Sequence, residues 1–411
     1  MAIHRTIAAL DIGTSKICCF IAEATDTGQI RVKGMSHQAS AGVKNGVIVD
    51  MEVAYQAILA AVHSAEQMAG QTINSVTASL AGGVPNSAII SRQMTIGGGA
   101  IREADIKRLR HDGRMAAQLD DRALIHAIPI GYQVDGSPSI LDPRGLHAQN
   151  LGLKMHLVTA KNSGVQNLAH CIAKCHLEIN DLVVGPYAAG LSALVEDERD
   201  LGAAVVDMGG GTTSLAVFYE GVAIHTDCLP VGGTHVTNDI ARGLSTPLAH
   251  AEKLKTLHGS AIQTAADDRE MLDVPQVGED DNDANQMPKS YLVSIIAPRI
   301  EETLELVKQR LEQSGVGGLA GQRIVLTGGA SQLPGVRELA QQILGKQVRL
   351  GRPLGIQGLA EATGGPAFAT AAGLLTFAVD DKGEARATTP NKSRQTGGMF
   401  SKMGGWFREN F

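Results

Sequence analysis

Three glycine-rich segments of the chain have residue types that suit the binding of a phosphate chain. Each follows a short apolar run, and the three are Asp11-Ile12-Gly13-Thr14-Ser15-Lys16, Asp207-Met208-Gly209-Gly210-Gly211-Thr212-Thr213 and Leu326-Thr327-Gly328-Gly329-Ala330-Ser331. Glycine lets backbone amides approach phosphate oxygens closely, because it has no Cβ to clash with them. The hydroxyls of Thr14 and Ser15 could bind further oxygens, while Asp11 and Asp207 could face a hydrated Mg²⁺. The third segment suits close packing against a flat ring.

Each segment alone is weak evidence, because glycine pairs are common in turns. Their order along one chain makes the combination more specific. The chain contains no G-x-x-x-x-G-K-[ST], which excludes a P-loop, and no G-x-G-x-x-G follows its first apolar run, as a dinucleotide-binding fold requires.

Short apolar runs on both sides of the first two segments predict strands that hold them. Residues 7–10 and 18–22 predict a buried hairpin around the first segment, and residues 203–207 and 215–218 predict a second one. Asp11 and Asp207 are 196 positions apart and take equivalent places in the two hairpins. We therefore expect a duplicated α/β domain.

The remaining pattern is expected to support these hairpins. Apolar spacing predicts a helix over 51–68, and a change of texture over 84–160 predicts an inserted module. A helix over 290–313 is expected to start or break near Pro298. Residues 265–285 are acidic and poor in apolar side chains, which predicts a mobile loop rather than a metal site.

Composition narrows the class of protein. The 411 residues suffice for two domains or more, and a 44% hydrophobic, 19% charged composition is typical of globular proteins. A net charge of −6 gives no electrostatic footprint for nucleic acid, which we do not expect as a partner. Five cysteines without a C-x-x-C motif favour a reducing, cytosolic compartment. We expect neither a secretory signal nor a membrane-spanning helix.

The segments DIGTSK, VVDMGGGTTSLAVF and VLTGGASQLPGV resemble the phosphate-1, phosphate-2 and adenosine motifs of the actin, Hsp70 and sugar-kinase superfamily. The stretches LGLKMHLVTAKNSGVQNL, EDERDLGAAVVDMGGGTT and AEKLKTLHG are similar to the FtsA family of bacterial cell-division proteins, and this likeness spans nearly the whole chain. The resemblance implies two ribonuclease-H-like halves with ATP and Mg²⁺ in the cleft between them.

The resemblance also implies a division of the chain. The first half (IA) would consist of residues 1–83 and 161–205, with an inserted subdomain 1C at 84–160. The second half would have its core (IIA) at 206–233 and 316–379 and its upper lobe (IIB) at 234–315. A flexible linker would follow at 380–396, and an amphipathic membrane-targeting helix at 397–411.

The family pattern assigns roles around the nucleotide. Glu252 and Lys255 would contact ribose and adenine, although an exposed helical pair is the simpler alternative, and Gly329 would pack on the base. Asp207 would polarise the attacking water. Chaperone and MreB-like relatives place a glutamate before the proline of the first connecting helix, where this chain has Gly185. The resemblance therefore implies tight ATP binding with weak or no ATPase activity.

Protein partners also follow from the resemblance. The FtsZ C-terminal tail would bind the upper lobe near Arg299, Glu302 and Lys308, for which a solvated charged face is the alternative. The insert would contact neighbouring subunits of a filament and later divisome proteins, or else act as a lid.

The C-terminal segment MFSKMGGWFRENF has the pattern of an interfacial membrane anchor. At 100° per residue its large apolar side chains fall within an arc of about 140°, with the cations Lys402 and Arg408 on the opposite side. The apolar set is Met399, Phe400, Met403, Trp406, Phe407 and Phe411. A short helix of this kind on a polar linker predicts binding to anionic lipid, whereas docking on its own domain is the alternative.

The resemblance, together with the C-terminal pattern, implies an ATP-binding, actin-like protein that polymerises on the cytoplasmic face of the inner membrane and anchors the FtsZ ring at the septum. A PilM-like assembly protein and a small-molecule kinase of the same superfamily are the rival hypotheses.

Overall fold

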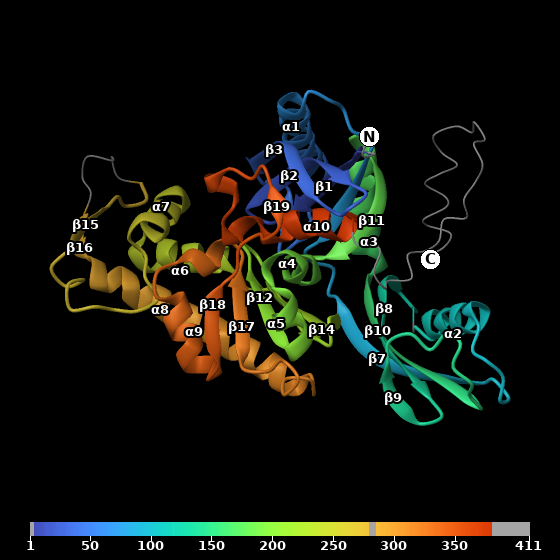
Figure 1. Cartoon of the computed structure of the whole chain (residues 1–411). Helices are drawn as coiled ribbons and strands as arrows, with labels where there is room; N and C mark the ends of the chain where they lie inside the picture. Colours follow the sequence, from blue (N-terminus) through green and yellow to red (C-terminus); the bar gives the residue numbers. More distant parts are fainter. Residues whose placement is uncertain (1–3, 118, 279–284, 380–411) are drawn as a thin grey trace.

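The computed structural model describes residues 4–117, 119–278 and 285–379, and it contains two large sheets (Figure 1). Five strands of one sheet follow the same order as the five strands of the other. In the first sheet the order is β11-β6-β1-β2-β3-β19. Its strands are β1 (His4–Ile12), β2 (Lys16–Thr25), β3 (Ile30–Ala39), β6 (Ser75–Leu80), β11 (Glu178–Val184) and β19 (Ile356–Gln357). Strands β1, β2 and β3 form an antiparallel meander, and β6 and β11 run parallel to β1.

The second sheet has the order β14-β13-β12-β17-β18. Its strands are β12 (Ala203–Met208), β13 (Thr213–Tyr219), β14 (Val222–Leu229), β17 (Arg323–Thr327) and β18 (Gln347–Leu350). Here β12, β13 and β14 form the meander, and β17 and β18 run parallel to β12. The expected duplication is therefore present, with β1, β2, β3, β6 and β11 matching β12, β13, β14, β17 and β18.

The two hairpins agree in register as well as in order. Asp11 pairs with Cys18 in the first hairpin, and Asp207 pairs with Ser214 in the second. Each turn is closed in the same way, with Gly13 N donating to Lys16 O at 3.0 Å and Gly209 N donating to Thr212 O at 2.8 Å. The repeat predicted from Asp11 and Asp207 therefore extends to the geometry of the turns.

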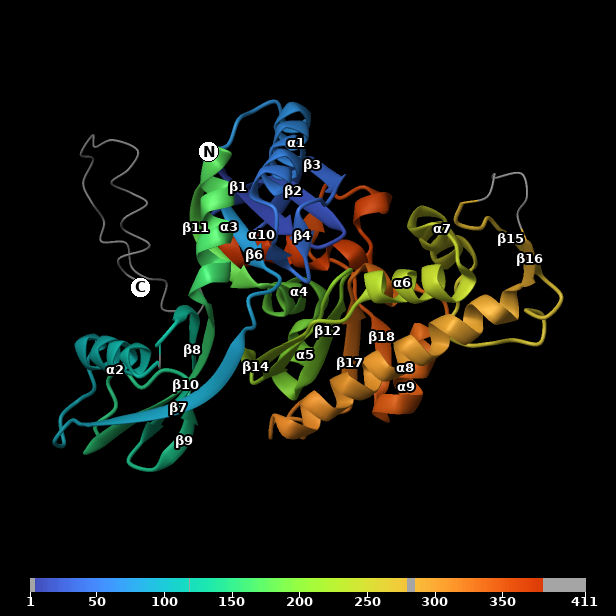
Figure 2. The same cartoon turned by 180° about the vertical axis from the view of Figure 1, so that it is seen from behind.

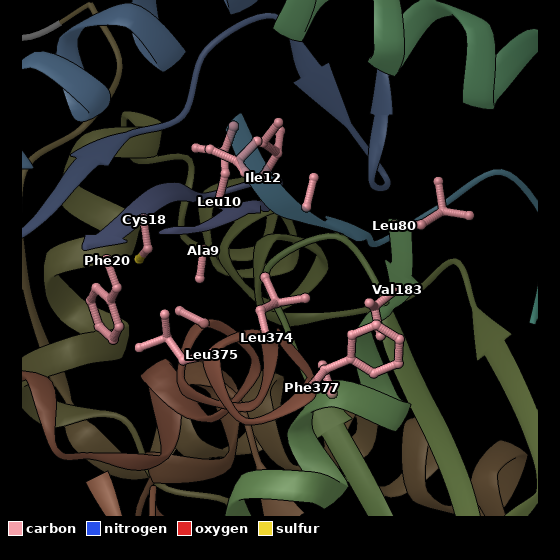
Figure 3. Close-up of a cluster of buried hydrophobic side chains, with 14 of the residues drawn as sticks. Ala9, Leu10, Ile12, Cys18, Phe20, Leu80, Val183, Leu374, Leu375 and Phe377 are labelled. Atoms are coloured by element: carbon pink, nitrogen blue, oxygen red, sulfur yellow. The ribbon is translucent and has the colours of Figure 1, made fainter. Parts of the chain in front are cut away.

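Two helices lie between the sheets. They are α4 (Gly185–Ala193) and α10 (Ala369–Val379), which follows a 3₁₀ turn at Pro366–Phe368. A Cβ on Gly373 of α10 would lie 1.7 Å from the carbonyl oxygen of Ala188 in α4, so only glycine permits this approach. Leu374, Leu375 and Phe377 pack into the core that β1 and β2 line (Figure 3).

Helices α1 and α3 lie on the outside of the first half, and α1 begins and ends at clear signals. Helix α1 (Met51–Ala69) starts after Asp50, whose carboxylate accepts from two backbone amides, and ends at Gly70 in the left-handed conformation. It covers β2 and β3, while α3 (Asn162–Lys174) follows the insert. The expected helix over 51–68 is confirmed. A small hairpin of β4 (Val43–Lys44) and β5 (Val47–Ile48) precedes α1.

The insert forms its own sheet, in the order β7-β10-β8-β9, covered by α2 (Glu103–Met115). Its strands are β7 (Asn86–Thr95), β8 (Arg122–Val134), β9 (Ser137–Ile140) and β10 (Asn150–Lys161). The insert has a separate apolar core, which includes Leu109, Leu151 and Met155. Figures 1 and 2 show it at the opposite end of the molecule from α6, α7 and β15–β16.

That opposite end is the lobe built on the second half. It contains α6 (Gly233–Leu244), α7 (Leu248–His258), β15 (Met271–Val274), β16 (Asn285–Pro288) and α8 (Lys289–Gln313). Helix α8 is continuous through Pro298, whereas we expected a start or a break there. The short helices α5 (Glu196–Leu201) and α9 (Val336–Leu344) complete the second half.

The described part of the acidic segment, residues 265–278 and 285, contains paired strands where its composition predicts a mobile loop. Strands β15 and β16 pair with each other, and the buried Asp267 lies 3.3 Å from Lys289 Nζ. Glu270 lies 2.9 Å from the same nitrogen. A single lysine at the start of α8 thus pairs with two carboxylates of this segment.

One further difference concerns the end of the chain. The resemblance implies that 316–379 belong to the second half, but β19 pairs with β3 of the first sheet, and α10 packs into the first core. The chain thus crosses back to the first half after β18. No helix within the described ranges is both long and apolar enough to span a bilayer.

Candidate functional site

The first two glycine turns meet each other. A Cβ on Gly210 would lie 2.7 Å from Ser15 Oγ, and a Cβ on Gly211 would lie 2.5 Å from Thr14 Oγ1. Both distances are shorter than any real contact, so the approach of the two turns requires glycine at these positions. The predicted phosphate-binding residues of the two halves are therefore adjacent.

Hydrogen bonds to flanking segments hold both turns. Thr14 Oγ1 accepts from Gly46 N in the β4–β5 turn at 2.9 Å, and Ser40 N donates to Ser15 O at 3.1 Å. In the second half, the amides of Gly233 and Thr234, at the start of α6, donate to the carbonyls of Gly209 and Gly210 at 2.9 and 2.7 Å. The turns are thus tied to the elements that follow each meander.

Asp11 and Asp207 bring two carboxylates to this junction. Asp11 is buried and Asp207 is partly exposed, and burial is the main cause that raises the pKa of both. The negative charge of Asp11 contributes to a pKa of about 6 for Asp207. Lys16 lowers both pKa values because its positive charge favours the ionised carboxylates.

Each carboxylate is held by a hydroxyl that the sequence reasoning missed. Ser79, at the end of β6, donates to Asp11 Oδ1 at 2.7 Å and accepts from Ile12 N at 3.0 Å. Thr370, in the first turn of α10, donates to Asp207 Oδ2 at 2.9 Å. Ser79 lies in a strand that also contains Ser75 and Thr77, so its sequence context does not single it out, and Thr370 lies among small apolar residues that carry no site pattern.

This arrangement fits a hydrated divalent cation. The charge of Asp11 raises the pKa of Asp207, and a cation beside the two carboxylates would offset this repulsion. The hydroxyls of Thr213 and Thr327, both buried next to the turns, have no hydrogen-bond partner within the described chain. No group of three or more His, Cys, Asp or Glu side chains in that part of the chain could hold a metal ion directly.

Lys16 has a partner from the far end of the chain. Its Nζ donates to the carbonyl of Ala367 and lies 3.6 Å from the centroid of the Phe368 ring. The ammonium group is therefore anchored on the segment that leads into α10, while its charge acts on Asp11 and Asp207.

The third glycine segment follows β17 and touches the second. Gly328 has a φ of +83°, and a Cβ there would lie 2.4 Å from both Asp207 Oδ1 and Met208 O. A Cβ on the exposed Gly329 would meet no atom within 4 Å, so this residue presents a free backbone surface. A Cβ on Gly233 would lie 3.3 Å from Ala330 Cβ and 3.7 Å from Lys255 Nζ.

Glu252 and Lys255 on α7 are therefore next to the third segment, and they are paired. Lys255 Nζ lies 2.7 Å from Glu252 Oε2, 2.8 Å from Thr237 Oγ1 and 3.2 Å from Gly233 O. Thr237 Oγ1 donates to Glu252 Oε2 at 2.5 Å. The structure thus brings the predicted nucleotide residues together, and Thr237 joins them.

Comparison with known proteins identifies the family. A model of the cell division protein FtsA matches residues 204–373, and a model of the SHS2 domain inserted in FtsA matches residues 82–159. The chain is 42% identical to the cell division protein FtsA of Rhizobium meliloti, over 99% of this chain and 95% of that protein. The chain belongs to the FtsA family. The identity to the FtsA of Escherichia coli is 31%, over 99% of each chain.

Solved structures show the fold that FtsA shares with other actin-like proteins. A PilM–PilN type IV pilus biogenesis complex gives a TM-score of 0.66 at 18% identity, over 91% of this chain and 98% of that one. MreB5 of Spiroplasma citri bound to ADP gives 0.55 at 14% identity, over 91% and 96%. A second structure of that protein is bound to AMPPNP. These similarities support the fold alone, so the PilM-like hypothesis gains nothing from them.

The residues expected to bind FtsZ lie on α8 and are not part of the cluster of predicted nucleotide residues around the glycine turns. Arg299 Nε lies 2.6 Å from Asp239 Oδ2 on α6, and its Nη1 is bonded to Glu302. Lys308 is exposed two turns further along the helix. The residues expected to bind the membrane, from Met399 to Phe411, lie outside the described residues.

Proposed function

We propose that this FtsA-family chain binds ATP with Mg²⁺ between its two halves. The observation that carries the proposal is the meeting of two equivalent hairpin turns. Each has an aspartate near its strand end, and Gly210 and Gly211 of the second turn touch Ser15 and Thr14 of the first. A phosphate chain needs backbone amides from both sides, and a hydrated cation needs carboxylates beside it. The paired turns supply both.

Each residue then has a defined task. The hydroxyls of Thr14 and Ser15 bind phosphate oxygens, together with amides of the two turns other than those of Gly13 and Gly209, which close the turns. Asp11 and Asp207 accept hydrogen bonds from the water shell of Mg²⁺, which supplies the charge that neutralises the phosphates. Glu252 and Lys255 bind the ribose and adenine, and Gly329 packs on the base because no side chain covers it.

The same geometry supports slow hydrolysis. Asp207 is the carboxylate that polarises the attacking water, and its partly exposed position at the junction suits this role. A Cβ on Gly185 would lie 4.0 Å from Asp207 Oδ2, so this position faces the same place but offers no carboxylate. The protein therefore holds its nucleotide as a structural switch rather than as a substrate to be turned over quickly.

The proposal extends to the cell-division role of the family. The chain polymerises on the cytoplasmic face of the inner membrane at the septum, bound to anionic lipid through residues 397–411 on the linker 380–396. The upper lobe around Arg299, Glu302 and Lys308 binds the FtsZ tail, and the insert binds neighbouring subunits and later divisome proteins. Support comes from family membership and from the insert at the opposite end from the lobe (Figure 2).

The deciding experiment is equilibrium binding of ATP to the full chain by calorimetry, with Mg²⁺ and with EDTA. We expect binding that Mg²⁺ strengthens in the wild type. Loss of that Mg²⁺ effect is expected in Asp207→Asn, which removes one charge at nearly constant shape. Glu301→Gln, on the exposed side of α8, is the matched control. Wild-type protein that binds no ATP under either condition contradicts the proposal.

A further inference from the structure

A five-residue segment from the far end of the chain contacts all three glycine segments. The carbonyl of Pro366 accepts from Gly328 N at 3.0 Å, and the carbonyl of Ala367 accepts from Lys16 Nζ. Thr370 Oγ1 donates to Asp207 Oδ2 at 2.9 Å. Residues 366–370 therefore reach one member of each nucleotide-binding segment.

Thr370 differs from the other threonine of its helix. Thr376 makes the bond usual for a threonine inside a helix, donating to the carbonyl of Ala372 one turn earlier at 3.4 Å. Thr370 is buried and directs its hydroxyl away from its own helix to a carboxylate. A hydroxyl placed among Ala, Gly, Leu and Phe side chains is costly to bury without such a partner.

The bond joins the two halves of the molecule. Helix α10 packs into the first core, with Leu374, Leu375 and Phe377 among the side chains of β1, β2 and β6 (Figure 3). Asp207 is the penultimate residue of β12 in the second sheet. Asp11, by contrast, is held by Ser79 from its own sheet. The orientation of Asp207 therefore depends on how the first half sits against the second.

Other contacts hold both partners of the Thr370–Asp207 hydrogen bond in place. Ser192 Oγ donates to the carbonyl of Ala369 at 2.6 Å, and Gly373 lies against the backbone of α4, so the first turn of α10 is held in place. The other carboxylate oxygen, Asp207 Oδ1, lies where a side chain on Gly328 would be. With Oδ2 held by Thr370, the carboxylate has one orientation.

We propose that Thr370 is a positioning residue that holds Asp207 across the two halves in the orientation that binds the Mg²⁺ of a nucleotide complex. The inference rests on the proposed binding of ATP and Mg²⁺ and adds a residue of the first half to the metal site. Thr370 acts through Asp207 and need not touch the nucleotide. Its removal should therefore weaken only the part of the affinity that depends on Mg²⁺.

The test compares ADP affinity with Mg²⁺ and with EDTA in the full chain. Thr370→Val keeps the shape of the side chain and removes the hydroxyl. We expect its ADP affinity with Mg²⁺ to fall about tenfold, which is the scale of a lost hydrogen bond to a charged group. Its ADP affinity in EDTA should be unchanged. Thr370→Ser should restore the wild-type ratio of the two affinities. Thr376→Val, on the same helix, should leave that ratio unchanged.

A double-mutant cycle with Asp207→Asn tests whether Thr370 acts through Asp207. In that background Thr370→Val should have no further effect, because the charge it orients is absent. A wild-type ratio in Thr370→Val, or a loss in Thr370→Ser as large as in Thr370→Val, overturns the inference while the ATP proposal stands. Wild-type protein that binds ADP neither with Mg²⁺ nor with EDTA removes both proposals.

Discussion

His156 of the insert lies against the second half of the molecule, with its Nδ1 2.8 Å from the carbonyl oxygen of Ala223 in β14. A carbonyl can only accept, so Nδ1 carries the proton. Nε2, 2.7 Å from Ser87 Oγ, then accepts from that hydroxyl, which itself accepts from Thr226 N at 3.2 Å. The insert interrupts the first half in sequence but is hydrogen-bonded to the second.

This contact predicts a pH-dependent stability. Burial, with the nearby His225 on β14 and His126 on β8, lowers the pKa of His156 from 6.5 to about 3. Below pH 6.5 His156 is protonated in the unfolded chain but stays neutral in the folded chain. The free energy of unfolding therefore falls as the pH falls from 6.5 to about 3. His156→Gln should lower the slope of the free energy of unfolding against pH by about 1.4 kcal/mol per pH unit between pH 6 and about 4.

The measurement is urea unfolding of the two proteins at several pH values. His170→Gln, at an exposed position on α3, is the control and should retain the wild-type slope. Identical slopes in wild type and His156→Gln would show that His156 is not kept neutral by its surroundings.

Gly210→Val should abolish most ATP binding. A Cβ at this position would meet Ser15 at 2.7 Å, so a valine separates the two turns and blocks amide access to phosphate. We expect affinity to fall about tenfold to 100-fold, the scale of an overpacked contact. A Cβ on Gly318 would meet no atom within 4 Å, so Gly318→Val is the matched control. Wild-type affinity of Gly210→Val by calorimetry would place the nucleotide elsewhere.

ATP hydrolysis should be slow, because Gly185 supplies no carboxylate near the attacking water. A Cβ there has ordinary clearance, 3.9 Å from Thr370 Cγ2, so Gly185→Glu can place a carboxylate beside Asp207. We expect phosphate release to be faster in Gly185→Glu than in Gly185→Gln, which matches it in size but lacks the charge. Wild-type turnover of order 10 per second or above contradicts this prediction.

Charge reversal at Arg299 should weaken binding of an FtsZ tail peptide by about tenfold, measured by fluorescence anisotropy. Arg299→Glu also loses the ion pairs with Asp239 and Glu302, at a cost of about 1 kcal/mol in folding stability. Arg337→Glu, which breaks the pair with Glu338 on α9, controls for that loss. Unchanged peptide affinity in Arg299→Glu would remove this residue from the binding site.

Membrane attachment should depend on Trp406 and Phe407 jointly, because a short helix gains its affinity from a few large apolar groups that bury roughly 150–250 Å² each. Trp406→Glu and a truncation after Thr396 should lose vesicle flotation, whereas Ser401→Glu should lose far less. Lys402 and Arg408 should add about 1 kcal/mol each on anionic lipid and much less on neutral lipid. Equal flotation of wild type, Trp406→Glu and the truncated chain would mean that the anchor lies elsewhere.

Local backbone requirements are what the sequence by itself determined. The glycines at 209–211 and 328–329 and the 196-residue offset between Asp11 and Asp207 were enough to predict two equivalent hairpins and a phosphate site, since turns that bring backbone close need glycine whatever surrounds them. The apolar spacing of 51–68 likewise predicted α1, because helix periodicity is a property of neighbouring residues.

Contacts between distant residues were decided only by the tertiary structure. Thr370 and Asp207 are 163 positions apart, and nothing in the composition of α10 indicates that one hydroxyl reaches a carboxylate of the other half. The ion pairs of Lys289 with Asp267 and Glu270 were missed for the same reason, since the pairing of β15 with β16 brings the start of α8 back to these two carboxylates. Such bonds depend on how two elements pack, and packing is a property of the whole chain rather than of any segment.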